Sequence, residues 1–218
     1  MAEPVQSNSQ RIRLLLCLVM VAPYLSAGEV LARQEASPRP VNRTAAVGGF
    51  VGGIVVGLAA HEGAHLLFDV VFDADPGVKP VDFHGIPFFA ITHRSDVSPR
   101  QEYTISSAGF WMQQATNEWL LTARPRLRFE QAPFAKGVFA FNVGASAAYS
   151  VAAFAQTGPP ERDTRGMAAS SRLDERWIGA VVLAPAVLDT WRYFNPDSRW
   201  AVWASRAAKV GSVLLVLR

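Results

Sequence analysis

Apolar and polar segments alternate along the chain in a pattern that predicts helices long enough to cross a membrane. The apolar segments are residues 14–24, 45–72, 105–122, 134–155, 177–194 and 201–217. As a helix, segment 45–72 would be about 42 Å long, which exceeds the roughly 30 Å of a bilayer's hydrocarbon core. Segments 134–155 and 177–194 are predicted to be two further spans.

The two remaining internal apolar segments contain polar residues, and their placement stays open. Segment 105–122 is interrupted by two glutamines, an asparagine and a glutamate, and is expected to be an amphipathic, re-entrant or buried spanning helix. Segment 201–217 contains Arg206 and Lys209 and is expected to lie along the interface or to cross obliquely. The predicted fold class is mainly α, a helical membrane protein with three to four spanning helices.

A stripe of small residues predicts how the first of these helices packs. Gly49, Gly53 and Gly57 are spaced four residues apart, so they share one helix face and let another helix approach closely in lipid. A Gly-rich helix buried in the core of a soluble protein is the alternative interpretation.

The polar segments contain breaks and charges that suggest loops and an orientation. Residues 73–104 are rich in Asp and Pro and are expected to form a loop insert with a short hairpin. Arg124, Arg126, Arg128 and Lys136 form the densest basic loop, which the positive-inside rule places on the cytoplasmic side. Three other arginines precede the 45–72 helix: Arg33, Arg39 and Arg43. If they lie on the other side of the membrane from the basic loop, they favour the opposite orientation.

The N-terminal region has the form of a targeting segment. Residues 1–27 combine arginines, an apolar run and small residues, which predicts a secretory signal peptide or a short anchor. Residues 28–44 are polar and are expected to be a linker, and residues 45–218 to be one helical membrane domain.

Composition narrows the chemistry and the partners. Half of the residues are apolar, 18% are charged, and the mean hydropathy is +0.14, which excludes a disordered or highly charged soluble chain. The net charge is only +3, and no basic run alternates with aromatics, so nucleic acid is not an expected partner. Because Cys17 is the single cysteine, metal ligands must come from His, Asp or Glu.

An HExxH sequence lies inside the longest apolar segment, in His61-Glu62-Gly63-Ala64-His65. On a helix the two histidines stand about 40° apart on one face, so both imidazoles can bind one metal ion. Zn²⁺ suits such ligands and keeps a position open for water. Glu62 is then placed to act as the general base that takes a proton from this water.

The third metal ligand is open between two main candidates. Asp189 is favoured, because a lone carboxylate deep in an apolar span is costly unless a metal or a partner compensates it. Glu118 is the alternative, by analogy with soluble HExxH peptidases. The remaining candidates are Asp69, His84 and His93, of which Asp69, one turn after His65, is better suited to a hydrogen bond to a ligand imidazole.

These residues together resemble the site-2-protease family of intramembrane zinc metalloproteases, the M50 peptidases. The resemblance covers residues 45–194 and includes the HExxH helix, a segment with Ala108-Gly109 and Asn117, and a later Leu188-Asp189. It implies zinc held by His61, His65 and Asp189, with Asn117 supporting the site. The sequence has Ala64 and Thr190 where the family usually has glycine.

The expected function is therefore a membrane-embedded zinc metalloprotease that hydrolyses peptide bonds with a metal-activated water. Its partners would be membrane lipid and a membrane-associated protein or peptide substrate, and its location a bacterial membrane, the inner one by expectation. The alternatives are a soluble periplasmic zinc peptidase with Glu118 as third ligand, and a non-catalytic membrane protein with a structural metal site.

Overall fold

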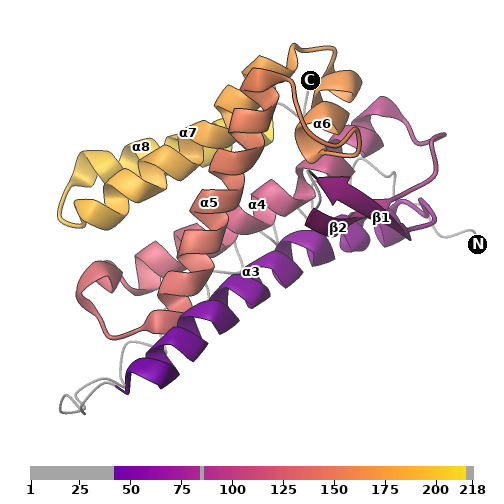
Figure 1. Ribbon diagram of the computed structural model, residues 1–218. Helices are drawn as coiled ribbons and strands as arrows, with labels where there is room; N and C mark the ends of the chain where they lie inside the picture. Colours follow the sequence, from indigo (N-terminus) through magenta and orange to yellow (C-terminus); the bar gives the residue numbers. More distant parts are fainter. Residues whose placement is uncertain (1–41, 84–85, 215–218) are drawn as a thin grey trace, which may run out of the picture.

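The computed structural model describes residues 42–83 and 86–214 (Figure 1). The expected signal peptide or anchor at 1–27, nearly all of the linker at 28–44, and His84 lie outside the described residues. Within them the fold is mainly helical, as predicted. The helices are α3 (Arg43–Val71), α4 (Pro99–Ala123), α5 (Pro133–Ala155), α6 (Asp163–Ser171), α7 (Glu175–Phe194) and α8 (Arg199–Leu214), with a 3-10 turn η1 (Leu127–Phe129).

Two described helices, α3 and α5, are long and apolar enough to cross a membrane. The Asn42 side chain caps α3 by accepting hydrogen bonds from the backbone N–H groups of Thr44 and Ala45, at 3.0 and 3.4 Å. Helix α5 begins with Pro133, whose fixed φ suits the first turn of a helix.

The glycine stripe of α3 faces α5. A Cβ atom on Gly53 would overlap the backbone of Phe134, and one on Gly57 would lie 2.7 Å from the Phe141 ring. On the other side, a Cβ atom on Gly137 would overlap the Phe50 carbonyl group. The two backbones therefore approach closely, which the glycine spacing predicted.

Helix α4 runs through the centre of the bundle and contacts α3, α5, α6, α7 and α8. It starts with a capping box, in which the Ser98 hydroxyl accepts from the Gln101 backbone N–H and the Gln101 side chain accepts from the Ser98 N–H. Most of its residues are buried, including the polar side chains that interrupt segment 105–122. Segment 105–122 is thus part of a longer helix enclosed by the others.

Strands β1 (Gly77–Phe83) and β2 (Ile86–Thr92) pair antiparallel, with Gly77 opposite Thr92 and Phe83 opposite Ile86. This hairpin lies near the C-terminal end of α3 and beside α6 (Figure 1). The Arg94 N–H donates to the Ala74 carbonyl at 2.9 Å, which fixes the base of the hairpin to the end of α3. The hairpin, the α5–α6 connection and the last turns of α3 thus meet at one end of the bundle.

Candidate metal centre

His61 and His65 lie one turn apart in the last third of α3, and their side chains converge. The two Nε2 atoms are 3.3 Å apart, and the ring centroids are separated by 5.0 Å. Both side chains are buried. The prediction that HExxH forms a helical turn with both imidazoles directed at one point agrees with this geometry.

The carboxylate that joins the two histidines belongs to Asp163. Its Oδ2 atom lies 3.1 Å from the His61 Nε2 and 3.4 Å from the His65 Nε2. Asp163 is the first residue of α6, and the preceding Arg162 forms a two-pronged ion pair with Glu175 at 2.6 and 2.7 Å. This ion pair fixes the α5–α6 connection to the start of α7 and so fixes the position of Asp163.

Contacts to the histidines orient their rings toward this carboxylate. The His65 Nδ1 lies 2.7 Å from the Ile105 carbonyl oxygen, and since a carbonyl only accepts, Nδ1 carries a proton; in the neutral form of this imidazole Nε2 then presents its lone pair. The His61 ring lies directly over Gly109, where a Cβ atom would overlap it, and stacks on Tyr149 with centroids 5.9 Å apart. The Nδ1 atom of His61 is buried without a hydrogen-bond partner among the described residues.

The three donor atoms fit a divalent metal ion. Zinc binds nitrogen and oxygen ligands at about 2.0–2.1 Å in a tetrahedral arrangement, which places ligand atoms about 3.3–3.4 Å from one another. The three separations measured here, 3.1, 3.3 and 3.4 Å, form such a triangle. Two imidazoles and one carboxylate also leave the fourth tetrahedral position open, as in catalytic zinc sites.

The electrostatics of Asp163 favour its role as a ligand. Burial raises the pKa of this carboxyl, but the charge of His65 and hydrogen bonds with both imidazoles lower the pKa by more, to below its ordinary value. Asp163 therefore stays ionised near neutral pH, which a metal ligand requires.

A pocket of about 360 Å³ opens beside the three donors and contains Glu62. Its wall is formed by both strands of the hairpin, by α5 and by the α5–α6 connection, and it includes His65, Tyr149 and Asp163. Its apolar lining comes from the hairpin and α5, and its polar lining residues include Glu62, His65 and Asp163. This is the form of a site that takes an extended apolar ligand next to a reactive centre.

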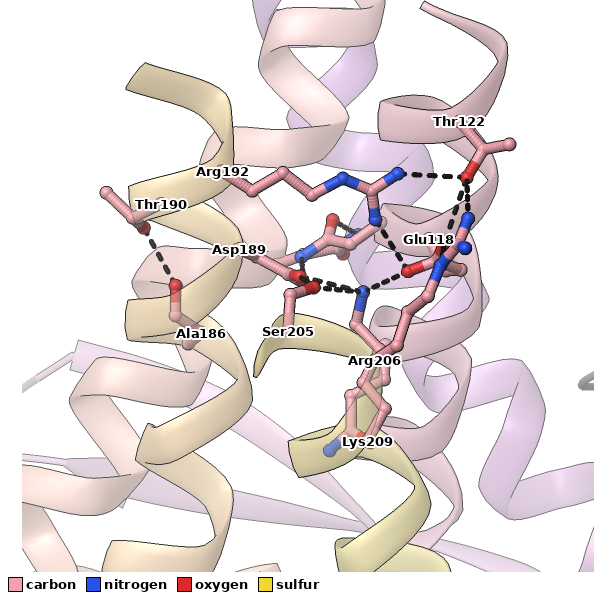
Figure 2. Close-up of polar contacts among 12 residues, drawn as sticks. Glu118, Thr122, Ala186, Asp189, Thr190, Arg192, Ser205, Arg206 and Lys209 are labelled. Carbon is pink, nitrogen blue, oxygen red and sulfur yellow. Dashed lines mark hydrogen bonds and ion pairs between the residues drawn. The ribbon is translucent and has the colours of Figure 1, made fainter. Parts of the chain in front are cut away.

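The predicted third ligand, Asp189, is not the carboxylate that lies with the two histidines, and its oxygens have other partners. Its Oδ1 is 2.7 Å from the Lys209 Nζ and accepts a hydrogen bond from the Ser205 hydroxyl at 2.6 Å (Figure 2). Its Oδ2 accepts from the Asn117 amide at 3.1 Å. The cost of burying this carboxylate is offset by an ammonium group on α8.

Glu118, the alternative third ligand, belongs to the same buried ion network as Asp189. Its carboxylate oxygens lie 2.7 Å from Arg192, 2.9 Å from Arg206 and 2.9 Å from Lys209 (Figure 2). The network joins α4, α7 and α8 and contains neither histidine of the HExxH sequence. Glu118 is thus paired with three cationic side chains and is not grouped with the two histidines.

The other predicted supporting residues also have different partners. Asp69 is fully buried, and among the described residues its carboxylate has no hydrogen-bond partner; Nδ1 of His93 lies 3.6 Å from its Oδ1. Asn117 bonds to Asp189 and Asn142, so it supports the ion network. His93 pairs with Glu102 at 2.6 Å.

The sequence offered only a weak signal for Asp163. It follows Gly158-Pro159-Pro160 in a segment of mixed charge, and an acidic residue at the start of a short helix is common without any metal. Its proximity to α3 depends on how α6 packs on α4, where Gly166 lies against Ser106 so closely that a Cβ atom would overlap the hydroxyl. Only the tertiary structure brings this residue to the histidines.

Comparison with known proteins finds no matching family model, no matching curated protein and no matching solved structure.

Proposed function

We propose that this protein is a membrane-embedded zinc metallopeptidase, with His61, His65 and Asp163 as metal ligands and Glu62 as general base. The observation that carries the proposal is the triangle of three donor atoms with metal-like spacing, placed at the edge of a pocket that also contains Glu62. The proposal keeps the HExxH chemistry expected from the resemblance to site-2 proteases and replaces Asp189 by Asp163.

Peptide hydrolysis needs a nucleophile, a base and a donor for the leaving amine. A bound Zn²⁺ would lower the pKa of a water molecule and polarise the substrate carbonyl group. Glu62 takes a proton from the attacking water as the oxygen adds to the carbonyl carbon. It then gives this proton to the departing nitrogen as the C–N bond breaks, so that one water is consumed and a carboxylic acid and an amine result.

The remaining residues of the site hold this arrangement in place. Ile105 fixes the tautomer of His65 through its carbonyl group. Gly109 and Tyr149 confine the His61 ring between α4 and α5. Because these contacts come from rigid helices, the ligands are positioned before the metal binds.

The distribution of apolar side chains supports membrane embedding. Large apolar residues lie on the outside of the helices: Val47, Val51 and Val55 on α3, Val151 and Phe154 on α5, Val187 and Trp191 on α7, and Trp200, Trp203 and Val210 on α8. Polar and charged residues fill much of the interior instead, among them Gln113, Asn117, Glu118, Asn142, Asp189 and Lys209. This inversion is expected where lipid, and not water, surrounds the protein.

Helix α8 has the most inverted face. Its inward side carries Ser205, Lys209 and Ser212, and its outward side carries Trp200 and Trp203. An isolated amphipathic helix of a soluble protein has the opposite arrangement. We accordingly assign α3, α5 and α7 as spans that enclose α4, with α8 packed alongside α7 and facing lipid.

The test combines metal content with cleavage. The full-length protein is purified in detergent, its zinc content is measured, and cleavage of a mixed-sequence peptide library is followed by mass spectrometry of new N-termini. Glu62→Gln is expected to keep zinc and lose cleavage, whereas Asp163→Asn is expected to lose both.

Two controls make this outcome specific. Asp189→Asn is expected to retain zinc, because Asp189 is bonded to Lys209 and Ser205. Glu130→Gln changes a glutamate at the other end of the bundle and is expected to leave cleavage unchanged. A wild-type protein that binds no metal would contradict the proposal, and zinc binding without any Glu62-dependent cleavage would favour a structural metal site.

A further inference from the structure

Exposed basic residues gather at the end of the bundle that lies away from the metal centre. This basic end comprises the start of α3, the α4–α5 connection and the α7–α8 connection, on the left side of Figure 1. It carries six basic residues and two acidic ones: Arg43, Arg124, Arg126, Arg128, Lys136 and Arg199, with Glu130 and Asp197. Both acidic residues are already paired with arginines.

Contacts between the segments show that these charges share one end. Gly49, near the start of α3, lies against Pro133, where a Cβ atom would approach the proline ring to 3.3 Å. Arg126 forms an ion pair with Asp197 at 3.3 Å, which joins the α4–α5 connection to the α7–α8 connection. Arg128 lies over the Phe194 ring, 5.0 Å from its centroid.

This arrangement removes a conflict in the sequence. Arg43 and the Arg124–Lys136 group were counted on opposite sides of the membrane, as if a single crossing separated them. Because α3 and α4 cross the bundle in opposite directions, the start of α3 and the end of α4 lie at the same end. The two basic groups therefore favour the same orientation.

The opposite end holds the metal centre and has no such excess of positive charge. Residues 73–102 and 156–176 contain seven basic and nine acidic residues. His61 is about 27 Å along α3 from Arg43, at 1.5 Å per residue, which is close to the thickness of a hydrocarbon core. The pocket thus opens at the membrane face away from the basic end.

Exposed tryptophans lie near both ends of the bundle. Trp177, at the start of α7, is 69% exposed, and Trp191, near its end, is 41% exposed. The two residues are about 21 Å apart along the helix axis. Trp200, in the first turn of α8, is 79% exposed at the basic end. Tryptophans at both ends of an apolar surface are typical of the two interfaces of a bilayer.

We propose that the basic end binds the anionic phospholipid headgroups of the cytoplasmic leaflet, so that the metal centre and its pocket open on the opposite, non-cytoplasmic side. Exposed arginines at this end present planar guanidinium groups that pair well with lipid phosphates. The proposal rests on the membrane embedding included in the proposed function, but not on zinc binding or peptidase activity.

The test is cysteine labelling in intact cells with a membrane-impermeant maleimide. Cys17 is first replaced by serine in the full chain, and one cysteine is then introduced by Arg126→Cys or by Asp96→Cys. These side chains are 70% and 75% exposed, at the basic end and the metal-centre end respectively. Asp96→Cys is expected to be labelled in intact cells, and Arg126→Cys only after permeabilisation.

Every other labelling pattern overturns the orientation. Labelling of Arg126→Cys alone in intact cells would show the reverse orientation, labelling of both would show that no membrane separates the two ends, and labelling of neither would place the hairpin end inside the cell. Zinc content and cleavage are measured on the same variants, so a failure of the orientation is distinguishable from a failure of the peptidase proposal.

A charge-reversal pair tests the headgroup contact. The protein carrying Arg126→Glu and Arg128→Glu is reconstituted into phosphatidylglycerol-containing vesicles and into phosphatidylcholine vesicles, beside wild type and a control carrying Arg94→Glu. Wild type and the control are expected to incorporate more completely into the anionic vesicles, and the double variant to lose at least half of this preference. An unchanged preference in the double variant would contradict headgroup binding at this end.

Discussion

The His61 imidazole packs against Gly109, and at this point α4 leaves room for the ring of this proposed metal ligand. A methyl group on Gly109 would overlap three atoms of the ring. Neither helix backbone can retreat easily, because both are packed against α5 and other neighbours. The side chain that must move is therefore the ligand itself.

Gly109→Ala is thus expected to weaken zinc affinity by about 10–100-fold, the range seen when groups that orient a metal ligand are altered.

The matched control is Gly63→Ala, within the HExxH sequence itself. Gly63 is exposed, and a Cβ atom added there would lie more than 4 Å from the packing neighbours that the structure describes, so alanine there should leave zinc affinity unchanged and raise helix stability by up to about 1 kcal/mol. Competition with a fluorescent chelator measures both, and equal affinities in the two variants would refute the expected role of Gly109.

The pair of His93 and Glu102 gives a residue-scale prediction about pH. Their hydrogen bond, at 2.6 Å, raises the pKa of His93 above 6.5 and lowers the pKa of Glu102 below 4.5. The contribution of protonated His93 to the free energy of unfolding is fully present below pH 6.5 and is lost as the pH rises through the raised pKa of His93. Stability from Glu102 is present above pH 4.5 and is lost as the pH falls through its lowered pKa.

The stability difference between wild type and His93→Gln should therefore be largest between about pH 4.5 and 6.5 and should shrink on both sides of this window. Chemical denaturation in detergent at a series of pH values measures it. A difference that does not change with pH would show that the pair contributes by packing alone.

At the scale of elements, α8 is attached to the bundle through a buried ammonium group. The Lys209 Nζ lies between Asp189 and Glu118 and so contacts both α7 and α4 from α8 (Figure 2). Removing this charge leaves Asp189 with two neutral hydrogen-bond donors, while Glu118 keeps two arginines. An uncompensated buried carboxylate is strongly unfavourable.

Lys209→Met, which keeps the apolar stem of the side chain, is expected to destabilise the protein by about 3–5 kcal/mol. Lys79→Met, at an exposed site on the hairpin, should cost no more than about 1 kcal/mol. Thermal unfolding in detergent compares the two. Zinc content of folded Lys209→Met should equal that of wild type, and a loss of zinc would argue that the ion network is coupled to the metal centre.

Some properties of helix α3 could be predicted from its own sequence, and others depend on its tertiary contacts. The spacing of its histidines fixes both imidazoles on one face, and the spacing of its glycines predicts a close helix partner, because both properties depend only on helix geometry. The identity of that partner, α5, and the carboxylate that joins the histidines depend on residues far along the chain. Asp189 was a reasonable candidate by cost of burial, but Lys209 in another helix meets that cost.

For the whole molecule, the inverted distribution of polar and apolar residues predicts how the protein fractionates. We expect the chain to stay in the membrane pellet after washing with alkaline carbonate, because lipid-facing side chains on α3, α5, α7 and α8 would otherwise be exposed to water. A known peripheral protein, released by the same wash, is the control. Release of this chain into the supernatant would favour the soluble alternative.

The sequence by itself determined the helical class, the helical turn of the HExxH sequence and the close packing of the glycine stripe, since each follows from residues within one turn or one helix of each other. Only the tertiary structure decided the third donor, the ion network that holds Asp189 and Glu118, and the gathering of the basic residues at one end. One physical reason applies to all three features. The free energy of a buried or clustered charge depends on the charged or polar groups that the fold places beside it, and these groups come from distant parts of the chain.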